Sequence, residues 1–496
     1  MSKILLVTSN FEENVEPMYA DREKVMAMVD GSHYPLGLPY IHSYMESLGH
    51  EVRTLFLNSY GWELCFSEMT KALEEFRPDI VGFQMLTQNR VSTYKLMEHI
   101  HEKYPNIKIV AGGVHASIMY EQLVKKYPYL MVVIGEGEIS FAELVKALEE
   151  ESELANVDGI AFSREGRMVK TRHRPLIKDL DMLPFPKHEL YFNDNRMFGC
   201  LLTSRGCPCK CSFCALDSIS LGVNRTRSVK NVIEEIELMM KQFPQMKRIW
   251  IHDDTFFLNN KRVIEFCDEV IKRKIKMEFI CSGRIKPFTE EMAKKLEEAN
   301  FTKIMFGLES GVDSILVRAH KGITQQRVLD TFRILSKTKL DVMCFLIVGL
   351  PGETEETIIE TANFVKKLQK MRYIRYGDAA ILRVYPGTEV YRIAKEKGQL
   401  TDDYWLGDGP TPHYLVENSE EELVRYEKLL LDRIAIDRIL TWNVLKGDWQ
   451  DALKAQWEML PYGFAYLAEF TWKRKGPAAS RLVSKVIRKI PVLGKK

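Results

Sequence analysis

Short aliphatic runs alternate with amphipathic stretches along the first 150 residues of the chain. Each run is bounded by polar residues or glycine, as is typical of strands, whereas the stretches between them repeat apolar residues at helical spacing. Strands are expected at residues 3–7, 51–55, 80–83, 108–111 and 131–134, and helices at 38–48, 68–76, 91–103, 122–126 and 139–149. This alternation predicts a doubly wound parallel sheet, in which ligands bind beyond the carboxyl ends of the strands.

The same alternation returns between residues 199 and 415. Six strands are expected there, at 201–203, 248–251, 277–281, 303–306, 342–348 and 377–384, fewer than the eight of a closed barrel. The stretch between the two regions contains a hairpin that turns at Glu165–Gly166 and then L-P-F-P, whose prolines favour an extended connector. An α/β protein is predicted, with a first sheet domain (1–150), a linker (151–198), a second βα region (199–415) and a helical C-terminal region (416–496).

The overall composition narrows the class of protein. The 496 residues are 46% hydrophobic and 28% charged, as in ordinary globular proteins, and the net charge of +2 gives no sign of nucleic-acid binding. No apolar run approaches the ~20 residues needed to span a bilayer. The N-terminus does not have the features of a secretory signal. Nine cysteines in a chain without such a signal favour a reducing, cytoplasmic location over a disulfide framework.

Three cysteines lie within eight residues in the stretch T-S-R-G-C-P-C-K-C-S-F-C, at the end of the first strand of the second region. Cys207, Cys211 and Cys214 have the spacing C-x-x-x-C-x-x-C. A closed structural metal site needs four ligands, whereas three protein ligands leave one metal atom of a cluster open for chemistry. The alternative is a zinc site closed by Cys209, although zinc ligands usually come as two separated pairs. Cys200 is close enough in sequence to be a ligand as well.

This motif resembles the signature of radical S-adenosylmethionine (SAM) enzymes. The resemblance implies that Cys207, Cys211 and Cys214 hold a [4Fe-4S] cluster whose open iron chelates SAM. It also implies that an electron from the cluster cleaves SAM to a 5′-deoxyadenosyl radical, so that an electron donor such as a flavodoxin or ferredoxin is needed. The six βα units are then expected to form a partial barrel that is open on one side for substrate.

Charged and polar residues gather where the strands of the second region end, which is where active sites form in such barrels. The ribose diol of SAM suits a carboxylate and the SAM carboxylate suits a guanidinium; Glu309 and Arg284 supply those groups. The resemblance, through the pattern E-S-G, implies that Glu309 contacts the ribose. Asp253, in H-D-D, is a further candidate for cofactor binding, and its alternative is a solvated turn. Lys321 is either a surface lysine or a residue that reaches the site.

Glycine-rich loops follow two strands of the first sheet, as A-G-G-V-H-A-S and G-E-G-E. Together with P-L-G-L-P-Y-I and P-D-I-V-G-F-Q, they resemble the cobalamin-binding domain that precedes the barrel in one branch of radical SAM enzymes. The resemblance implies that the cobalamin site includes Gly112, Gly113, Gly135, Glu136 and Gly137.

Histidine ligation of cobalt is not expected, because the motif D-x-H-x-x-G is missing. Asp30 and His33 lie near Gly37, but their spacing differs from that motif. His33 is therefore interpreted as an ordinary loop histidine. His115, in the Gly-Gly loop, is expected either to face the cofactor or to lie at the surface.

The resemblance covers about residues 1–400 and implies a cobalamin-dependent methyltransferase that acts on an unactivated carbon and uses SAM twice, as methyl donor and as radical source. Two alternatives stay open: a radical SAM enzyme of the same architecture that cyclises or rearranges its substrate, and a non-catalytic metal- or cobalamin-binding protein.

The C-terminal region suggests a second environment. Aromatic residues from Trp442 onward are followed by nine basic residues after Glu469, and the apolar positions of 478–490 fall on one helical stripe. This pattern suits the surface of an anionic membrane, or alternatively a packed or disordered basic tail. The substrate is therefore expected to be a small molecule or a lipid, and the protein to be cytoplasmic with or without peripheral membrane contact.

Overall fold

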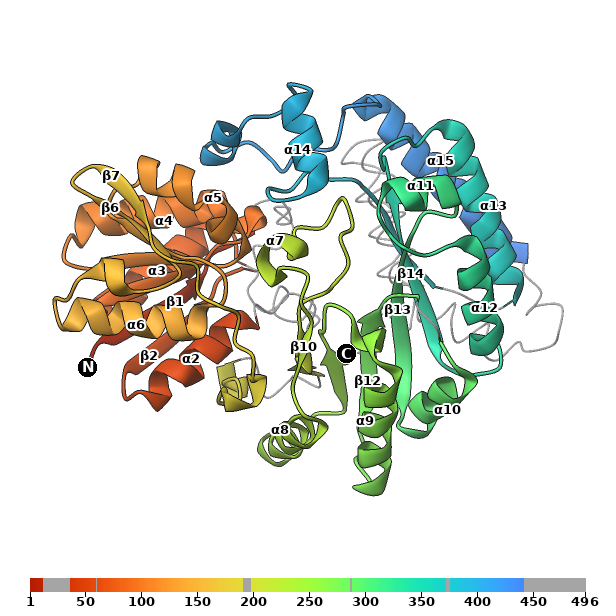
Figure 1. The fold of residues 1–496 in the computed structure, drawn as a ribbon, viewed down its shortest axis with the longest axis horizontal. Helices are drawn as coiled ribbons and strands as arrows, with labels where there is room; N and C mark the ends of the chain where they lie inside the picture. The colour runs from red at the N-terminus through yellow and green to blue at the C-terminus, as the bar shows by residue number, and fades with distance from the viewer. Residues whose placement is uncertain (12–35, 59, 191–197, 286–287, 372–374, 441–496) are drawn as a thin grey trace, which may run out of the picture. The chain divides into compact units, whose positions relative to one another are not determined.

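The computed structural model describes residues 1–11, 36–58, 60–190, 198–285, 288–371 and 375–440. Its elements up to Leu431 belong to one compact unit built on two large sheets, one formed before residue 171 and one after residue 197 (Figure 1). Among the described residues, no helix combines the length and the apolar character required to cross a bilayer.

The first sheet has seven strands in the order β2-β1-β3-β4-β5-β6-β7. β1 to β5 are parallel, and β6 and β7 form a hairpin that pairs antiparallel with β5. The bounds are β1 (Lys3–Thr8), β2 (Glu51–Phe56), β3 (Ile80–Gln84), β4 (Lys108–Gly112), β5 (Leu130–Val133), β6 (Ile160–Arg164) and β7 (Arg167–Lys170). The predicted parallel strands are confirmed. The hairpin that the sequence assigns to the linker instead extends this sheet, because Ile160 and Phe162 belong to its core.

Both faces of the first sheet are covered. In β1, Ile4 packs in one core and Leu5 in another, since successive side chains of a strand point to opposite faces. One face carries α2 (Gly37–Ser47) and α6 (Gly137–Glu149), and the other carries α3 (Trp62–Phe76), α4 (Arg90–Lys103) and α5 (Val114–Lys126). The predicted doubly wound sheet is confirmed. Its order β2-β1-β3-β4-β5 puts the topological switch point between β1 and β3.

The second sheet has six strands, all parallel, in the order β15-β14-β13-β12-β11-β8. The strands are β8 (Phe198–Leu201), β11 (Arg248–Ile251), β12 (Glu278–Gly283), β13 (Phe301–Glu309), β14 (Asp341–Val348) and β15 (Arg375–Ile381). The helices between them are α8 (Val229–Gln242), α9 (Asn260–Lys272), α10 (Glu290–Glu298), α12 (Gln325–Leu335) and α13 (Glu355–Met371), several of which line the outside of the sheet in Figure 1. β8 and β15 are its edges, so the expected partial barrel is confirmed.

Further strands and helices lie in the loops of this region and after its last strand. The loop after β8 contains β9 (Ser204–Arg205), α7 (Leu216–Ser220) and β10 (Arg225–Thr226); later segments contain α11 (Asp313–Arg318), α14 (Glu389–Glu396) and α15 (Glu420–Leu440). β8 ends at Leu201, two residues earlier than the strand predicted there, because the next residues turn to bind Asp253. The helix predicted at 421–434 is confirmed as part of α15.

Some expectations concern residues outside those that the structure describes. They are the assignment of His33 as a loop histidine and the aromatic and basic pattern between Trp442 and Lys496. The domain boundaries at residues 150, 198 and 415 stay predictions.

Candidate cofactor-binding site

The cysteine motif forms the loop between β9 and α7. Cys207 is buried, Cys211 is half-buried and Cys214 is exposed. Two backbone hydrogen bonds hold the middle of the loop, from the Ser212 N–H to the Ala319 carbonyl and from the Val390 N–H to the Ser212 carbonyl, each at 3.0 Å. The motif is therefore fixed to segments that follow β13 and β15.

All nine cysteines lie within the described residues, and none of them forms a disulfide there. Within the described residues, no three His, Cys, Asp or Glu side chains converge closely enough to hold a single metal ion. Cys209 is half-buried within the loop, and Cys200 is buried in β8.

Asp253 holds the start of the cysteine loop. Its carboxylate accepts hydrogen bonds from the backbone N–H groups of Thr203 (2.6 Å) and Ser204 (3.1 Å), and from their hydroxyl groups (2.5 and 2.7 Å). Burial raises the pKa of this carboxyl, while the four hydrogen bonds act in the opposite direction. The side chain is 4% exposed, so the alternative of a solvated turn is wrong. Since Thr203 and Ser204 occupy both carboxylate oxygens, the geometry does not favour the predicted direct contact with a cofactor.

The neighbouring Asp254 acts one step further along the loop. Its Oδ2 accepts a hydrogen bond from the Gly206 N–H at 2.8 Å. Gly206 has a φ of +88°, and any side chain there would overlap the Val223 carbonyl, so glycine is required directly before Cys207. The two aspartates of H-D-D therefore anchor successive residues of the loop to the end of β11.

Arg284, Glu309 and Lys321 lie around the cysteine loop. The Arg284 Nη1 is 3.2 Å from the Cys211 Sγ, and its buried Nε has no hydrogen-bond partner among the residues that the structure describes. Lys321 donates to the Glu309 Oε1 at 2.6 Å, and both residues are buried. The interpretation of Lys321 as a surface lysine is therefore wrong. Glu309 has a φ of +65°, a strained conformation for a residue other than glycine and one that is frequent at functional sites.

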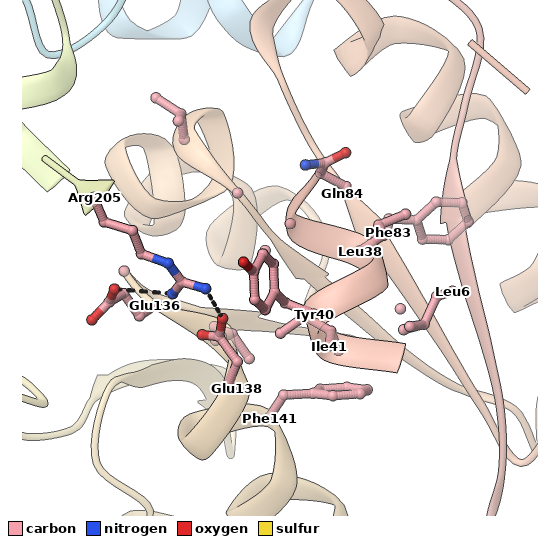
Figure 2. A pocket seen from close by; sticks show the side chains of 18 of the residues that line it. Leu6, Leu38, Tyr40, Ile41, Phe83, Gln84, Glu136, Glu138, Phe141 and Arg205 are labelled. Carbon is pink, nitrogen blue, oxygen red and sulfur yellow. Dashed lines mark hydrogen bonds and ion pairs between the residues drawn. The ribbon is translucent and has the colours of Figure 1, made fainter. Parts of the chain in front are cut away.

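A cavity of about 430 Å³ lies at the carboxyl ends of the first sheet, between α2 and α6. Figure 2 shows the apolar part of its wall, to which Leu6, Leu38, Phe83 and Phe141 contribute. All the predicted cobalamin-site residues line it: Gly112, Gly113, Gly135, Glu136 and Gly137. Ser204, Arg205 and Asp254 of the second region line it as well. The cavity and the cysteine loop therefore share a wall.

The backbone at this edge of the cavity requires glycine at position 113. Gly113 has a φ of +93°, and a Cβ there would lie 2.9 Å from the Met85 carbonyl oxygen. The backbone at the start of α5 can therefore keep its path only with glycine. A mostly apolar cavity with few polar groups at one side is typical of cofactor sites.

Glu136 lines the cavity and also binds two arginines. Its carboxylate binds Arg205 at 3.2 Å and Arg225 at 2.7 Å, and it accepts a hydrogen bond from the Ile177 N–H at 2.8 Å. Burial alone would raise the pKa of Glu136, but the hydrogen bond from Arg225 and the charge of Arg205 outweigh it and lower the pKa. Glu136 thus lines the cavity as the shared partner of two arginines. Arg205 is not among the site residues predicted from the sequence, although it lies directly before Gly206 and Cys207 of the cysteine motif.

His115 lies in the first turn of α5 and is 1% exposed. Its Nδ1 is 3.1 Å from the Thr87 hydroxyl and its Nε2 is 3.3 Å from the Tyr94 hydroxyl. Burial lowers the pKa of the imidazole to about 3, so it is neutral at ordinary pH. The surface alternative is wrong. His115 is not among the residues that line the cavity, and its contacts belong to the core that also contains Trp405.

Two family models match the chain. The model of the radical SAM superfamily matches residues 201–365, and that of the B12 binding domain matches residues 22–145. The first match contains β11 to β14 of the second sheet, and the second match contains β2 to β5 of the first sheet.

Two relatives illustrate the range of named activities. The uncharacterized methyltransferase PH0819 of Pyrococcus horikoshii is 34% identical over 381 residues, which are 75% of this chain and 80% of that protein. The anaerobic magnesium-protoporphyrin IX monomethyl ester cyclase of Rubrivivax gelatinosus is 28% identical over 362 residues, or 68% of this chain and 63% of the cyclase. The match therefore spans less than two thirds of the cyclase.

A solved structure has the same fold. The cobalamin-dependent S-adenosylmethionine radical enzyme OxsB, with aqua-cobalamin and S-adenosylmethionine bound, aligns with a TM-score of 0.69 and 17% identity over 99% of this chain and 75% of OxsB. The family models and the relative from Pyrococcus agree with this likeness. The chain therefore belongs to the cobalamin-dependent radical SAM enzymes, whose cofactors are cobalamin, a [4Fe-4S] cluster and SAM.

Proposed function

We propose that this enzyme transfers a methyl group from SAM to an unactivated carbon of its substrate. The observation that carries the proposal is the shared wall: residues at the start of the cysteine loop also line the cavity at the edge of the first sheet. A radical formed beside the loop and a methyl group held in the cavity can then meet at one substrate. The named activity of the relative from Pyrococcus supports methyl transfer.

The proposed cluster ligands are Cys207, Cys211 and Cys214. The three thiols lie on one loop, and the loop is fixed at its start by Asp253 and in its middle by Ser212. The Arg284 guanidinium lies beside the Cys211 sulfur, and a thiolate is the form of cysteine that binds metal. Cys209 is proposed as a non-ligand thiol.

We propose that Glu309 and Arg284 bind SAM. The residues suit the chemistry, because a buried carboxylate can accept from a ribose diol and a guanidinium can bind a carboxylate. Lys321 holds the Glu309 carboxylate from one side, so that the carboxylate is oriented before SAM binds. The unpartnered Nε of Arg284 leaves a buried donor for a ligand.

We propose that cobalamin is held by the cavity of the first sheet. Gly112, Gly113, Gly135 and Gly137 allow the backbone to approach the ligand closely, and the apolar side chains around them exclude water. When bound, cobalamin supplies the methyl group, and the cluster with SAM supplies the radical. The side chains of this chain bind, orient and shield the reactants.

Anaerobic reconstitution tests the proposal. The protein should take up about four iron and four sulfide per chain together with cobalamin, and should release 5′-deoxyadenosine and S-adenosylhomocysteine from SAM once a reductant is supplied. Cys207→Ala should abolish both products, whereas Cys209→Ala, a change of a neighbouring thiol, should keep them. Zinc bound through four thiolates, or SAM cleavage that survives Cys207→Ala, would contradict the ligand assignment.

Oxidative cyclisation is the second candidate, because the named activity of the Rubrivivax relative favours it. The mass of the product separates the two reactions: a methyl group is added in one and not in the other. Release of 5′-deoxyadenosine without S-adenosylhomocysteine would favour the cyclase. A non-catalytic binding protein would release neither compound.

We propose a small molecule or a lipid as substrate and a flavodoxin or ferredoxin as electron donor. The basic, aromatic C-terminal sequence is proposed to contact anionic membrane surfaces. Vesicle binding should fall when residues 473–496 are removed, and equal binding with and without them would refute the membrane contact.

A further inference from the structure

Arg205 connects the cysteine loop with the cobalamin cavity. We propose that it is a positioning residue that fixes the loop against the cavity and thereby sets the separation between the cluster and cobalamin. The inference rests on the proposed function, which assigns the cluster to the loop and cobalamin to the cavity. It adds a residue to which the family resemblance gave no function.

The backbone around Arg205 is held on the side of the second sheet. The residue before it, Ser204, is bound by the Asp253 carboxylate, and the N–H of the residue after it, Gly206, is bound by Asp254. Arg205 itself pairs with Arg225 in the short ladder of β9 and β10. Cys207 is two residues further on, so the position of this backbone limits where the first cluster ligand can lie.

The side chain of Arg205 binds the first sheet. Its Nη1 is 3.2 Å from the Glu136 Oε1 and its Nη2 is 2.7 Å from the Glu138 Oε1, as Figure 2 shows. The guanidinium also lies over the Tyr40 ring of α2, at 4.8 Å from its centroid. Arg205, Glu136 and Glu138 all line the cavity. These three residues, named here the Arg205 clamp, therefore form part of the shared wall.

The clamp requires arginine. A planar guanidinium can bind two carboxylates with separate N–H groups and can stack on an aromatic ring, whereas the single ammonium of lysine cannot do all three. The two carboxylates and the Tyr40 ring therefore all depend on a guanidinium at position 205.

The test compares Arg205→Gln with Arg225→Gln. Arg225 is a matched control, because it also binds Glu136 and is half-buried like Arg205, but it is not among the residues that line the cavity. Each reconstituted enzyme is assayed for iron, for cobalamin retention and for the magnetic interaction between the reduced cluster and cob(II)alamin in electron paramagnetic resonance. Products released from SAM are measured in parallel.

Arg205→Gln should keep its iron but alter the magnetic interaction and lower cobalamin retention. Release of S-adenosylhomocysteine should fall at least tenfold relative to 5′-deoxyadenosine, because radical formation continues when methyl transfer is misaligned. Arg205→Lys should be intermediate. An unchanged magnetic interaction in Arg205→Gln, or equal effects of the two Gln variants, would overturn the proposal.

A measurement on the apoprotein separates this proposal from the proposed function. Unfolding of Arg205→Gln, Glu138→Gln and the double variant measures whether the two side chains are coupled without any cofactor. Additive effects would refute the clamp whatever the cofactors do. If the two side chains are coupled but the wild-type protein takes up no cobalamin, the proposed function would be refuted instead. The positioning of one cofactor relative to the other would then be refuted as well.

Discussion

Replacement of Asp253 distinguishes an anchor of the cysteine loop from a ligand of a cofactor. The carboxylate accepts four hydrogen bonds, two from backbone N–H groups and two from the hydroxyls of Thr203 and Ser204. The hydroxyls can rotate toward other acceptors, whereas the backbone donors cannot. Asp253→Ala therefore leaves two buried N–H groups without an acceptor, and Asp253→Asn still offers them an amide oxygen.

The expected costs differ accordingly. Hydrogen bonds to charged groups contribute about 1.5–3 kcal/mol each, so the two lost backbone bonds should lower the free energy of unfolding of Asp253→Ala by about 3–6 kcal/mol. Asp253→Asn exchanges a charged acceptor for a neutral one and should cost about 1–2 kcal/mol. Asp254→Asn, the neighbouring control, changes a single hydrogen bond to Gly206 and should cost no more than Asp253→Asn.

Urea unfolding of the apoprotein and the iron content after reconstitution measure these effects. Asp253→Ala should lose stability and retain little iron, because the backbone before Cys207 is no longer fixed. If Asp253 were a cofactor ligand instead, Asp253→Ala would unfold like the wild type and show only weaker SAM binding. That result would refute the anchoring function.

Three further predictions concern single residues. Burial raises the pKa of Glu353 from 4.5 to about 8, so its contribution to stability is present below pH 4.5 and is lost as the pH rises through 8. The free energy of unfolding of Glu353→Gln minus that of the wild type should therefore grow between pH 4 and pH 9 by on the order of 4–5 kcal/mol, and a constant difference would contradict the reasoning. Gly113→Ala should weaken cobalamin binding and lower the melting temperature more than Gly166→Ala does. Both glycines have positive φ, but at Gly166 no atom of the described residues lies within 4 Å of an added Cβ. Equal shifts of the melting temperature would count against a tight cavity edge. Lys321→Met leaves the Glu309 carboxylate buried without its cation and should raise the KM for SAM about tenfold at normal iron content, which 5′-deoxyadenosine release at varied SAM concentration measures; an unchanged KM would remove Lys321 from the site.

Most of the fold could be predicted because local patterns determine it. The strands of both sheets are short apolar runs that alternate with amphipathic helices. This alternation favours parallel strands in a sheet whose faces are covered by the helices. The β6–β7 hairpin was misassigned to the linker because its sequence specifies a turn but not a partner strand. Its antiparallel contact with β5, through Val132 and Ala161, depends on residues that are 29 positions apart.

The candidate site was predictable in its location but not in its contacts. Strand-end loops are readable, and they led to Glu136, Arg284 and Glu309. The sequence could not tell that Glu136 binds Arg205 and Arg225, because these ion pairs join residues 69 and 89 positions apart. Nor could H-D-D reveal that Asp253 binds Thr203 whereas Asp254 binds Gly206, because these contacts join residues 50 and 48 positions apart.

The buried charges at the shared wall argue for a geometric function rather than a stabilising one. Removing ionised groups from water costs several kcal/mol each, and well-packed apolar residues in place of a buried ion pair often leave a protein equally or more stable. The lining of the cavity as a whole is mostly apolar, so apolar side chains in place of the ion pairs would match the rest of it. Apolar contacts are not directional, so two apolar surfaces can pack in several relative positions. The ion pairs of Arg205 with Glu136 and Glu138 form only at fixed distances. Ion pairs at this place therefore favour a single position of the cysteine loop relative to the cavity. The proposed reaction needs such a single position, because its two cofactors act on one carbon atom.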